Sequence, residues 1–270
     1  MKLSVVILCK NQLEYLKKSI PILLQQNIED QYEIVVVDSG STDKTIDFLK
    51  TQDIKLLQIK PEAFHFSKTF NWASSKCSGD ILIRLSGDVI PVDKYFLKNL
   101  VKQFNDKSVV ATYGKYILPK GSTKVLPFAW PEKRFDKKST IYQVDPSKLI
   151  WFLVTNKKHF IELGNLAGGA CAIRKDFFEK RPFNQNLIEA EDAEYAIYIH
   201  HQGYKIGYCA DAEVFHEHEK QKLNIKTVKK LTLVYSVLIK EVTKLHLNYL
   251  TQTTTSKIKN NLKTLNIIKS

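Results

Sequence analysis

Apolar residues in the first 117 positions form short runs that alternate with segments of helical spacing. The helical segments lie at residues 11–26, 44–50, 67–78 and 92–104. The continuous apolar runs between them predict buried strands at residues 3–9, 33–38, 54–59, 80–85 and 109–117. Pro21 predicts a kink or break in the first helix. The alternation predicts right-handed βαβ units and a mostly parallel central sheet with helices on both faces.

Beyond this region the pattern divides the rest of the chain into three parts. Residues 118–166 mix Pro, Lys and aromatic residues without a clear period, so we expect loops and short helices above the sheet. Regular patterning returns at residues 168–180 and 189–218. From residue 221 onwards the pattern is helical and rich in Lys. We therefore expect an α/β domain over residues 1–218 and a Lys-rich helical tail over residues 219–270.

Composition narrows the class of protein. The chain has 270 residues, of which 44% are hydrophobic, enough for one substantial core. Its four cysteines, with no CxxC pair among them, predict reduced thiols and a reducing, cytoplasmic compartment. The apolar stretch at the N-terminus is too short to favour a signal peptide, and no apolar run reaches the ~18 residues that span a bilayer.

The positive charge is concentrated in the tail. The net charge is +13, and residues 219–270 contribute 11 Lys against 2 Glu, which leaves +4 for residues 1–218. A basic tail on a nearly balanced domain argues against a protein whose main function is to bind nucleic acid.

Two aspartates lie at the carboxyl ends of predicted apolar strands. Asp38 ends the second predicted strand, and Asp88 lies just beyond the fourth, in the segment "GDILIRLSGDVIP". In open parallel sheets, ligands bind outside the carboxyl ends of the strands, so both carboxylates are expected along one edge. Carboxylates there suit a divalent cation and, through it, a diphosphate. The alternative is that each Asp only holds a turn, for which "DSGSTD" is suitable.

Four motifs in order resemble those of family 2 glycosyltransferases. "VVVDSGSTDKT" resembles their "DDGSTD" segment, "LIRLSGDVIP" their DxD region, "AEDAEYA" their acidic motif and "VFHEH" their late metal-binding histidine. "FSKTFN", "YGK" and "SGD" are similar to the bacterial branch that contains rhamnosyltransferases. The resemblance covers roughly residues 3–218. It implies a GT-A fold that binds a nucleoside-diphosphate sugar and transfers the sugar with inversion.

The resemblance also implies a set of donor-binding residues. Asp38 matches the position that hydrogen-bonds the nucleoside base, and residues 7–11 would form the opposite wall. Lys68 could neutralise phosphate or could be an ordinary surface lysine, and Gly168–Gly169 fit a donor-sugar pocket or a simple turn. The full donor-binding set is Cys9, Asn11, Asp38, Ser41, Lys68, Asn71, Ser86, Gly87, Asp88, Gly168 and Gly169.

A metal site follows from the same resemblance. Asp88 matches the second carboxylate of DxD and His216 the histidine ligand, with His218 as a possible substitute. The sequence departs from the family because Ser86 replaces the first Asp, which should weaken the binding of Mg²⁺ or Mn²⁺. An imidazole ligand favours Mn²⁺. The alternative for His216 and His218 is a pair of exposed histidines without a ligand role.

The catalytic candidates lie in the acidic segment at residues 189–194. Asp192 matches the catalytic base, which must take the proton of the acceptor hydroxyl. Glu191 could instead position the acceptor or serve as the base. The alternative is an acidic first turn of a helix without a catalytic role.

The tail predicts an amphipathic helix. Its apolar positions recur at spacings of three and four and are Ile225, Val228, Leu231, Val234, Leu238, Val242 and Leu245. Lysines 226, 229, 230, 240 and 244 lie off this stripe. The helix could pack on its own domain, form a homodimer with a second subunit, or attach to an anionic membrane surface as a peripheral protein.

We therefore expect a cytoplasmic, inverting glycosyltransferase that takes a nucleoside-diphosphate sugar to a glycan or lipid-linked glycan hydroxyl in surface polysaccharide or lipopolysaccharide assembly. One alternative is a sugar nucleotidyltransferase, but "LCKNQLEY" lacks the Gly-rich, basic loop expected after its first strand. The other is a non-catalytic basic protein that binds membrane or RNA on a transferase-like scaffold. The replacement of the first Asp of DxD by Ser86 is compatible with this alternative.

Overall fold

The computed structural model describes residues 1–125, 138–145, 148, 166–218 and 225–264. Its strands form one nine-stranded sheet in the order β3-β2-β1-β4-β8-β6-β9-β5, with β7 paired to β9. Most of the segment 118–166, where loops and short helices were expected, lies outside the described residues.

The first half of the sheet is parallel, as the apolar runs predict. It contains β1 (Lys2–Cys9), β2 (Gln31–Asp38), β3 (Lys55–Gln58) and β4 (Ile81–Ser86). β1 lies between β2 and β4, and β3 pairs with β2. Because these strands are covered on both faces, they need no polar positions between their apolar ones, and β1 is buried from its second residue onwards.

The second half is mixed, which the sequence pattern did not predict. It contains β5 (Ile90–Pro91), β6 (Val109–Ile117), β7 (Thr140–Tyr142), β8 (Ala170–Arg174) and β9 (Lys205–Phe215). β8 runs antiparallel to both β4 and β6, whereas β9 runs parallel to β6. The beginning of β8 and the end of β9 therefore lie at the same edge as the carboxyl ends of β1, β2 and β4.

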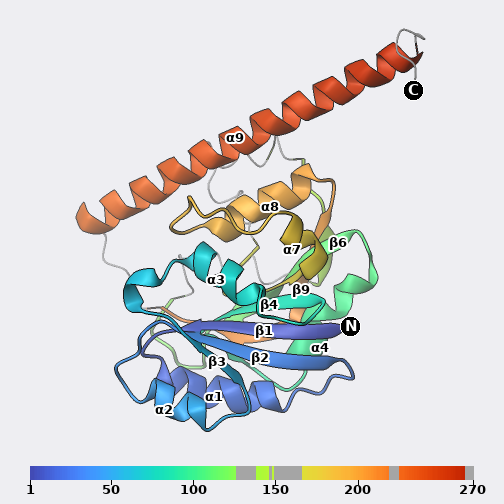
Figure 1. The fold of residues 1–270 in the computed structure, drawn as a ribbon. Coiled ribbons are helices and arrows are strands. Elements are labelled where there is room, and N and C mark those ends of the chain that lie inside the picture. Colours follow the sequence, from blue (N-terminus) through green and yellow to red (C-terminus); the bar gives the residue numbers. More distant parts are fainter. Residues whose placement is uncertain (126–137, 146–147, 149–165, 219–224, 265–270) are drawn as a thin grey trace.

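Helices cover both faces of the sheet, with α1 and α2 on one side and α3, α7 and α8 on the other (Figure 1). α4 packs against β6 and β9. The helices, including two short 3₁₀ segments η1 and η2, are α1 (Leu13–Leu24), α2 (Thr45–Lys50), η1 (Pro61–Ala63), α3 (Phe66–Ser74), α4 (Phe96–Val101), η2 (Lys102–Asn105), α7 (Lys175–Lys180), α8 (Glu191–His201) and α9 (Ile225–Thr264). Pro21 lies inside α1 and does not end it.

The tail forms the long helix α9, which lies across α8 on the outer side of the domain (Figure 1). Leu238 and Val242 of the predicted apolar stripe are buried against Ala193, Ile197 and Leu187. Val234 and Leu245 are half-buried. Among the described residues, none of the helices combines the length and apolar character needed to cross a bilayer.

Candidate active site

The carboxyl ends of three strands bring the first predicted residues together. The register pairs Cys9 of β1 with Asp38 of β2, and Leu8 of β1 with Ser86 of β4. The last residues of three largely apolar strands thus meet at one edge of the sheet, as expected for a ligand site in an open parallel sheet. A Cβ on Gly87 would lie 2.8 Å from the Cβ of Cys9, so the turn after β4 packs directly on the end of β1.

Asp38 is fully buried and holds its own turn. Its Oδ1 accepts hydrogen bonds from the backbone N–H groups of Gly40 and Ser41, each at 2.9 Å, and its Oδ2 accepts from the Ser41 hydroxyl. Cys9 Sγ lies 3.8 Å from Oδ2, and burial followed by this carboxylate raises the pKa of the Cys9 thiol. This geometry is the turn-holding alternative from the sequence; a contact between Asp38 and a nucleoside base stays a prediction.

Asn11 joins the loop after β1 to the loop after β2. Its side-chain Oδ1 accepts from the backbone N–H of Thr42 at 2.7 Å, and its backbone N–H donates to the Ser41 hydroxyl at 2.8 Å. Asn11 has a left-handed backbone with φ of 52°, as do Ala167 (55°) and Ala190 (68°), the other non-glycine residues with positive φ in the described chain. All three lie in segments that carry candidate site residues, where unusual backbone conformations tend to cluster.

The two donor-site candidates on α3 have different surroundings. Lys68 is exposed on the first turn of the helix. Asn71, by contrast, uses its amide on the backbone of Phe183: Nδ2 donates to the carbonyl at 2.9 Å and Oδ1 accepts from the N–H at 3.2 Å. The side chain of Asn71 therefore ties α3 to the segment before α8; a role beneath the nucleotide stays a prediction.

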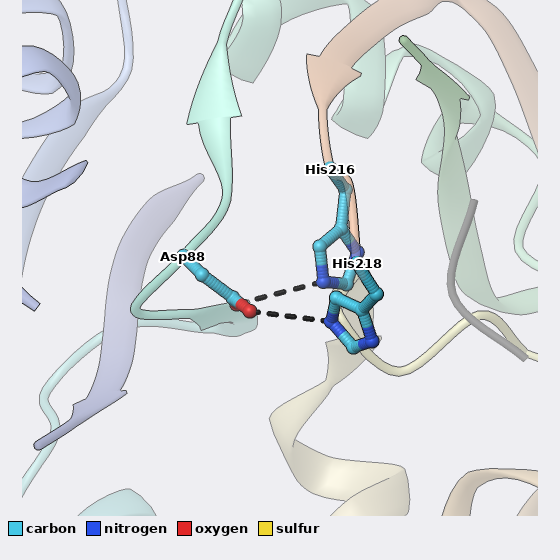
Figure 2. A group of neighbouring side chains, drawn as sticks. All are labelled: Asp88, His216 and His218. Carbon is cyan, nitrogen blue, oxygen red and sulfur yellow. Dashed lines mark ion pairs between the residues drawn. The ribbon is translucent and has the colours of Figure 1, made fainter. Parts of the chain in front are cut away.

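Asp88, His216 and His218 form a compact group (Figure 2). Asp88 Oδ1 lies 3.5 Å from His216 Nε2, and Oδ2 lies 3.3 Å from His218 Nε2. One ligand atom from each side chain lies within 4.8 Å of the other two. His216 is buried and His218 is partly exposed, so the group opens towards solvent on one side.

The electrostatics of this group suit a cation. Burial alone would raise the pKa of the Asp88 carboxyl, but hydrogen bonds from His216 and His218 and their charge outweigh it and hold that pKa well below its ordinary value. A carboxylate and two imidazole nitrogens are a donor set that Mn²⁺ and other divalent transition metals accept. Because Ser86 stands in place of the first Asp of DxD, Asp88 supplies the carboxylate of this group.

Gly168 and Gly169 lie between the group formed by Asp88, His216 and His218, the candidate metal site, and the acidic start of α8. The backbone N–H of Gly168 donates to Asp192 Oδ2 at 2.8 Å. A Cβ on Gly169 would lie 3.0 Å from the His216 ring and 2.7 Å from the Tyr116 hydroxyl. A larger residue at either position would force these side chains to move, because the backbone approaches them so closely. Asp88, His216 and Asp192 therefore lie around one Gly–Gly turn, which in turn accepts a hydrogen bond from the backbone of Ser86 at 3.0 Å.

The two acidic candidates have opposite environments. Asp192 is partly exposed, and its Oδ1 also accepts from the N–H of Ala193. Glu191 is buried and pairs with Arg84, with Oε1 2.6 Å from the guanidinium Nη2. Burial raises the pKa of the Glu191 carboxyl, and the Arg84 cation opposes this shift. Asp192 is thus the carboxylate that a substrate can reach, while Glu191 is buried in its ion pair with Arg84.

Sequence reasoning missed Arg84 and Tyr116. Arg84 has a visible signal, since it is the one charge inside the apolar run "ILIRL" at residues 81–85. Tyr116 donates from its hydroxyl to the Ala167 carbonyl at 2.9 Å and its ring packs edge-on against His216. It has no comparable signal, because an aromatic residue in a predicted strand is ordinary.

Known proteins resemble both the sequence and the structure. The family model described as "Glycosyl transferase family 2" matches residues 4–181. The O-antigen chain rhamnosyltransferase RfbN of Salmonella typhimurium is 28% identical over 225 residues, 81% of this chain and 67% of that protein. The O-antigen chain rhamnosyltransferase WbaN of Salmonella anatum is 30% identical over 200 residues, 72% of this chain and 59% of that protein.

The similarity to solved structures concerns the fold. A crystal structure of residues 1–349 of S. aureus TarS in complex with UDP superimposes with a TM-score of 0.61 at 17% identity, covering 88% of this chain and 65% of that one. GalNAc-T7 with UDP, GalNAc and Mn²⁺ gives 0.59 at 19%, covering 81% and 44%. These matches confirm the predicted GT-A fold. The chain spans about two thirds or less of each of these proteins. Since the family model covers more than half of the chain, this protein belongs to glycosyl transferase family 2.

Proposed function

We propose that this protein is an inverting glycosyltransferase, which moves a sugar from a nucleoside-diphosphate sugar to a hydroxyl group of a glycan or lipid-linked glycan. The observation that carries the proposal is the arrangement around Gly168–Gly169, with the accessible carboxylate of Asp192 on one side and Asp88, His216 and His218 on the other. Such an arrangement offers a base for an acceptor and a cation site for a diphosphate at the same edge of the sheet.

The reaction needs one proton acceptor. As the acceptor oxygen bonds to the anomeric carbon, the bond between that carbon and the diphosphate oxygen breaks, and one displacement inverts the configuration. Asp192 takes the hydroxyl proton, and the Gly168 N–H fixes the direction of its carboxylate. A divalent cation held by Asp88, His216 and His218 would neutralise the charge on the departing diphosphate. The two imidazoles favour Mn²⁺ over Mg²⁺.

The relatives guide the choice of donor. RfbN and WbaN are named as O-antigen chain rhamnosyltransferases, so a nucleoside-diphosphate rhamnose is the first donor to test, and a surface polysaccharide intermediate the first acceptor. Two structurally similar TarS structures contain UDP or UDP-GlcNAc, so uridine-diphosphate sugars should be tested as donors as well.

The test is a thermal-shift screen of nucleotide sugars with and without Mn²⁺, followed by transfer assays with the donor that stabilises most. A donor at a hundredfold its dissociation constant should add about 2.7 kcal/mol to the free energy of unfolding. We expect stabilisation by one class of donor, greater with Mn²⁺. A panel in which no donor stabilises the protein under either condition would contradict the proposal.

For the outward face of α9 we propose attachment to an anionic membrane surface, which would suit a lipid-linked acceptor. Leu233 and Leu247 are 54% and 58% exposed, and the side chains of Lys229, Lys240 and Lys244 are also exposed. Each such Lys near an anionic surface adds about 1 kcal/mol of attraction. Vesicle flotation with and without acidic lipid tests this. Equal recovery of the parent and a Lys229→Gln/Lys240→Gln/Lys244→Gln variant would leave contact with a second subunit as the better explanation.

A further inference from the structure

Arg84 is a cation buried beneath the candidate active site. It lies in the middle of β4 and is 6% exposed. Its guanidinium carbon is 5.7 Å from the centre of the Phe70 ring and 5.5 Å from that of Phe183. Removing an arginine from water costs several kcal/mol, and a single buried cation is retained only where its partners repay that cost. The surroundings of Arg84 therefore indicate what it does.

The direct partner of Arg84 is the first residue of α8. Glu191 Oε1 lies 2.6 Å from Nη2, and both side chains are almost fully buried. α8 has no side-chain cap: the residue before it, Ala190, has the left-handed φ of 68° and makes no capping hydrogen bond. The ion pair thus ties the first residue of this helix to strand β4 of the central sheet, and Asp192 is the next residue along.

The remaining side of the guanidinium faces the Gly–Gly turn. Nη1 is buried and has no hydrogen-bond partner. A Cβ on Gly168 would lie 3.1 Å from Nη1 and 2.8 Å from Asp192 Oδ2, so both atoms border the same point. The Gly168 N–H holds that oxygen of Asp192. Arg84 therefore acts on the Asp192 carboxylate through Glu191 and the start of α8, and its Nη1 lies beside the turn whose N–H holds that carboxylate.

We propose that Arg84 is a positioning residue for sugar transfer, which fixes the Asp192 carboxylate by holding Glu191 at the start of α8, without touching the substrates itself. This inference rests on the proposed function. A carboxylate displaced by about 1 Å from its productive position can lose about 10²-fold in rate. The expected signature is a lower kcat at unchanged donor affinity, because the described contacts of Arg84 are with Glu191, Phe70 and Phe183 and not with Asp88, His216 or His218.

The first test compares Arg84→Lys with Arg174→Lys as a matched control. Arg174 lies in the neighbouring strand β8, stacks 5.0 Å over Phe104 and bonds to the Val109 and Phe104 carbonyls. Lys keeps the charge in both variants but loses the planar fork. We expect both to lower Tm, and only Arg84→Lys to lower kcat, about tenfold or more, with the donor Kd within about threefold of the parent. A folded Arg84→Lys protein with the parental kcat would overturn the proposal.

The second test remains decisive if Arg84→Lys does not fold. The double variant Arg84→Met/Glu191→Gln removes both charges and so leaves no buried ion unpaired. We expect a Tm above that of Arg84→Met alone, while kcat stays at least about tenfold below the parent. Recovery of the parental kcat in the double variant would show that the pair only avoids a buried charge. A parent protein that transfers no sugar with any donor would instead count against the proposed function itself.

Discussion

Asp192 and Glu191 are adjacent carboxylates with different surroundings. Asp192 is partly exposed and held by the backbone N–H groups of Gly168 and Ala193, whereas Glu191 is buried against Arg84. Proton transfer by a positioned side chain contributes about 10²–10⁴-fold to a rate. Asp192→Asn keeps the shape and the hydrogen bond from Gly168 but removes the proton acceptor. We expect kcat to fall by about 10²–10⁴-fold, with the donor Kd unchanged in a thermal-shift titration.

The control for this change is Asp53→Asn, an exposed aspartate between α2 and β3. It makes the same change in charge away from the active site and should leave kcat at the parental value. Parental transfer by Asp192→Asn, with Glu191 intact, would mean that the base has been misassigned.

The candidate metal site of Asp88, His216 and His218 gives a second prediction about single residues. His216 is buried beside Asp88, and His218 lies at its open side. We expect His216→Ala to weaken the binding of Mn²⁺ by about tenfold or more, because the loss of one imidazole leaves a single carboxylate and one partly exposed histidine. Calorimetric titration of Mn²⁺ in the presence of a nucleoside diphosphate measures this. His246→Gln, a change in α9 outside the group, should bind Mn²⁺ like the parent; equal binding by His216→Ala would exclude His216 as a ligand.

Whether the role of a residue can be predicted from the sequence depends on how close in the sequence its partners lie. Asp88 and Asp192 stand out because they lie in short motifs that resemble those of the family; a carboxylate at a strand end or a helix start alone also serves turns and helix termini. The commitment of Asn71 to the Phe183 backbone and of Glu191 to Arg84 depends on segments more than 100 residues apart. A single sequence gives no access to such contacts, so neither the link from Asn71 to Phe183 nor the pairing of Arg84 with Glu191 can be predicted from it.

At the scale of elements, the inner side of α9 packs on its own domain, which is one of the alternatives that the sequence left open for the tail. The apolar stripe predicted at spacings of three and four includes Leu238 and Val242, which are both about 1% exposed. They pack on Ala193 and Ile197 of α8, the helix that also carries Asp192. The docking of the tail therefore adds apolar burial behind the acidic end of α8.

We expect Leu238→Ala to lower the stability of this contact by about 2–4 kcal/mol, through lost burial and the cavity left behind. Amide hydrogen exchange along α8 and α9 measures the effect, because a loss of docking speeds exchange there before it does in β1 or β2. The matched control is Leu247→Ala, on the same helix but 58% exposed, which should change exchange little. Similar effects from the two variants would mean that α9 does not dock as described.

At the scale of the whole molecule, the sheet determines where the candidate residues meet. Periodicity predicted the parallel half, because β1, β2 and β4 are continuous apolar runs. It could not predict that β8 runs antiparallel between β4 and β6, since strand direction depends on connections that pass through residues 118–166. That reversal brings Gly168–Gly169 to the carboxyl edge, where Asp88 and His216 lie. The family motifs identified the edge, and the topology explains why they gather there.

Buried histidines make the stability of the fold depend on pH. His200, at the end of α8, is 2% exposed, and burial lowers the pKa of its imidazole to about 4 from an ordinary value near 6.5. The unfolded chain therefore binds a proton between these values that the folded protein excludes. The resulting contribution to the free energy of unfolding is complete above the unfolded pKa and is lost as the pH falls from about 6.5 towards 4.

At pH 5 this loss should be about 2 kcal/mol for His200 alone. Burial raises the pKa of the Glu191 and Glu194 carboxyls, which gives the opposite trend, so the parent must be compared with His200→Gln across one pH range. Urea unfolding at pH 7.5 and pH 5 measures the difference. We expect the parent to lose more stability than the variant on acidification, because glutamine has no proton to gain. An equal loss in both proteins would show that His200 already carries its proton in the folded state.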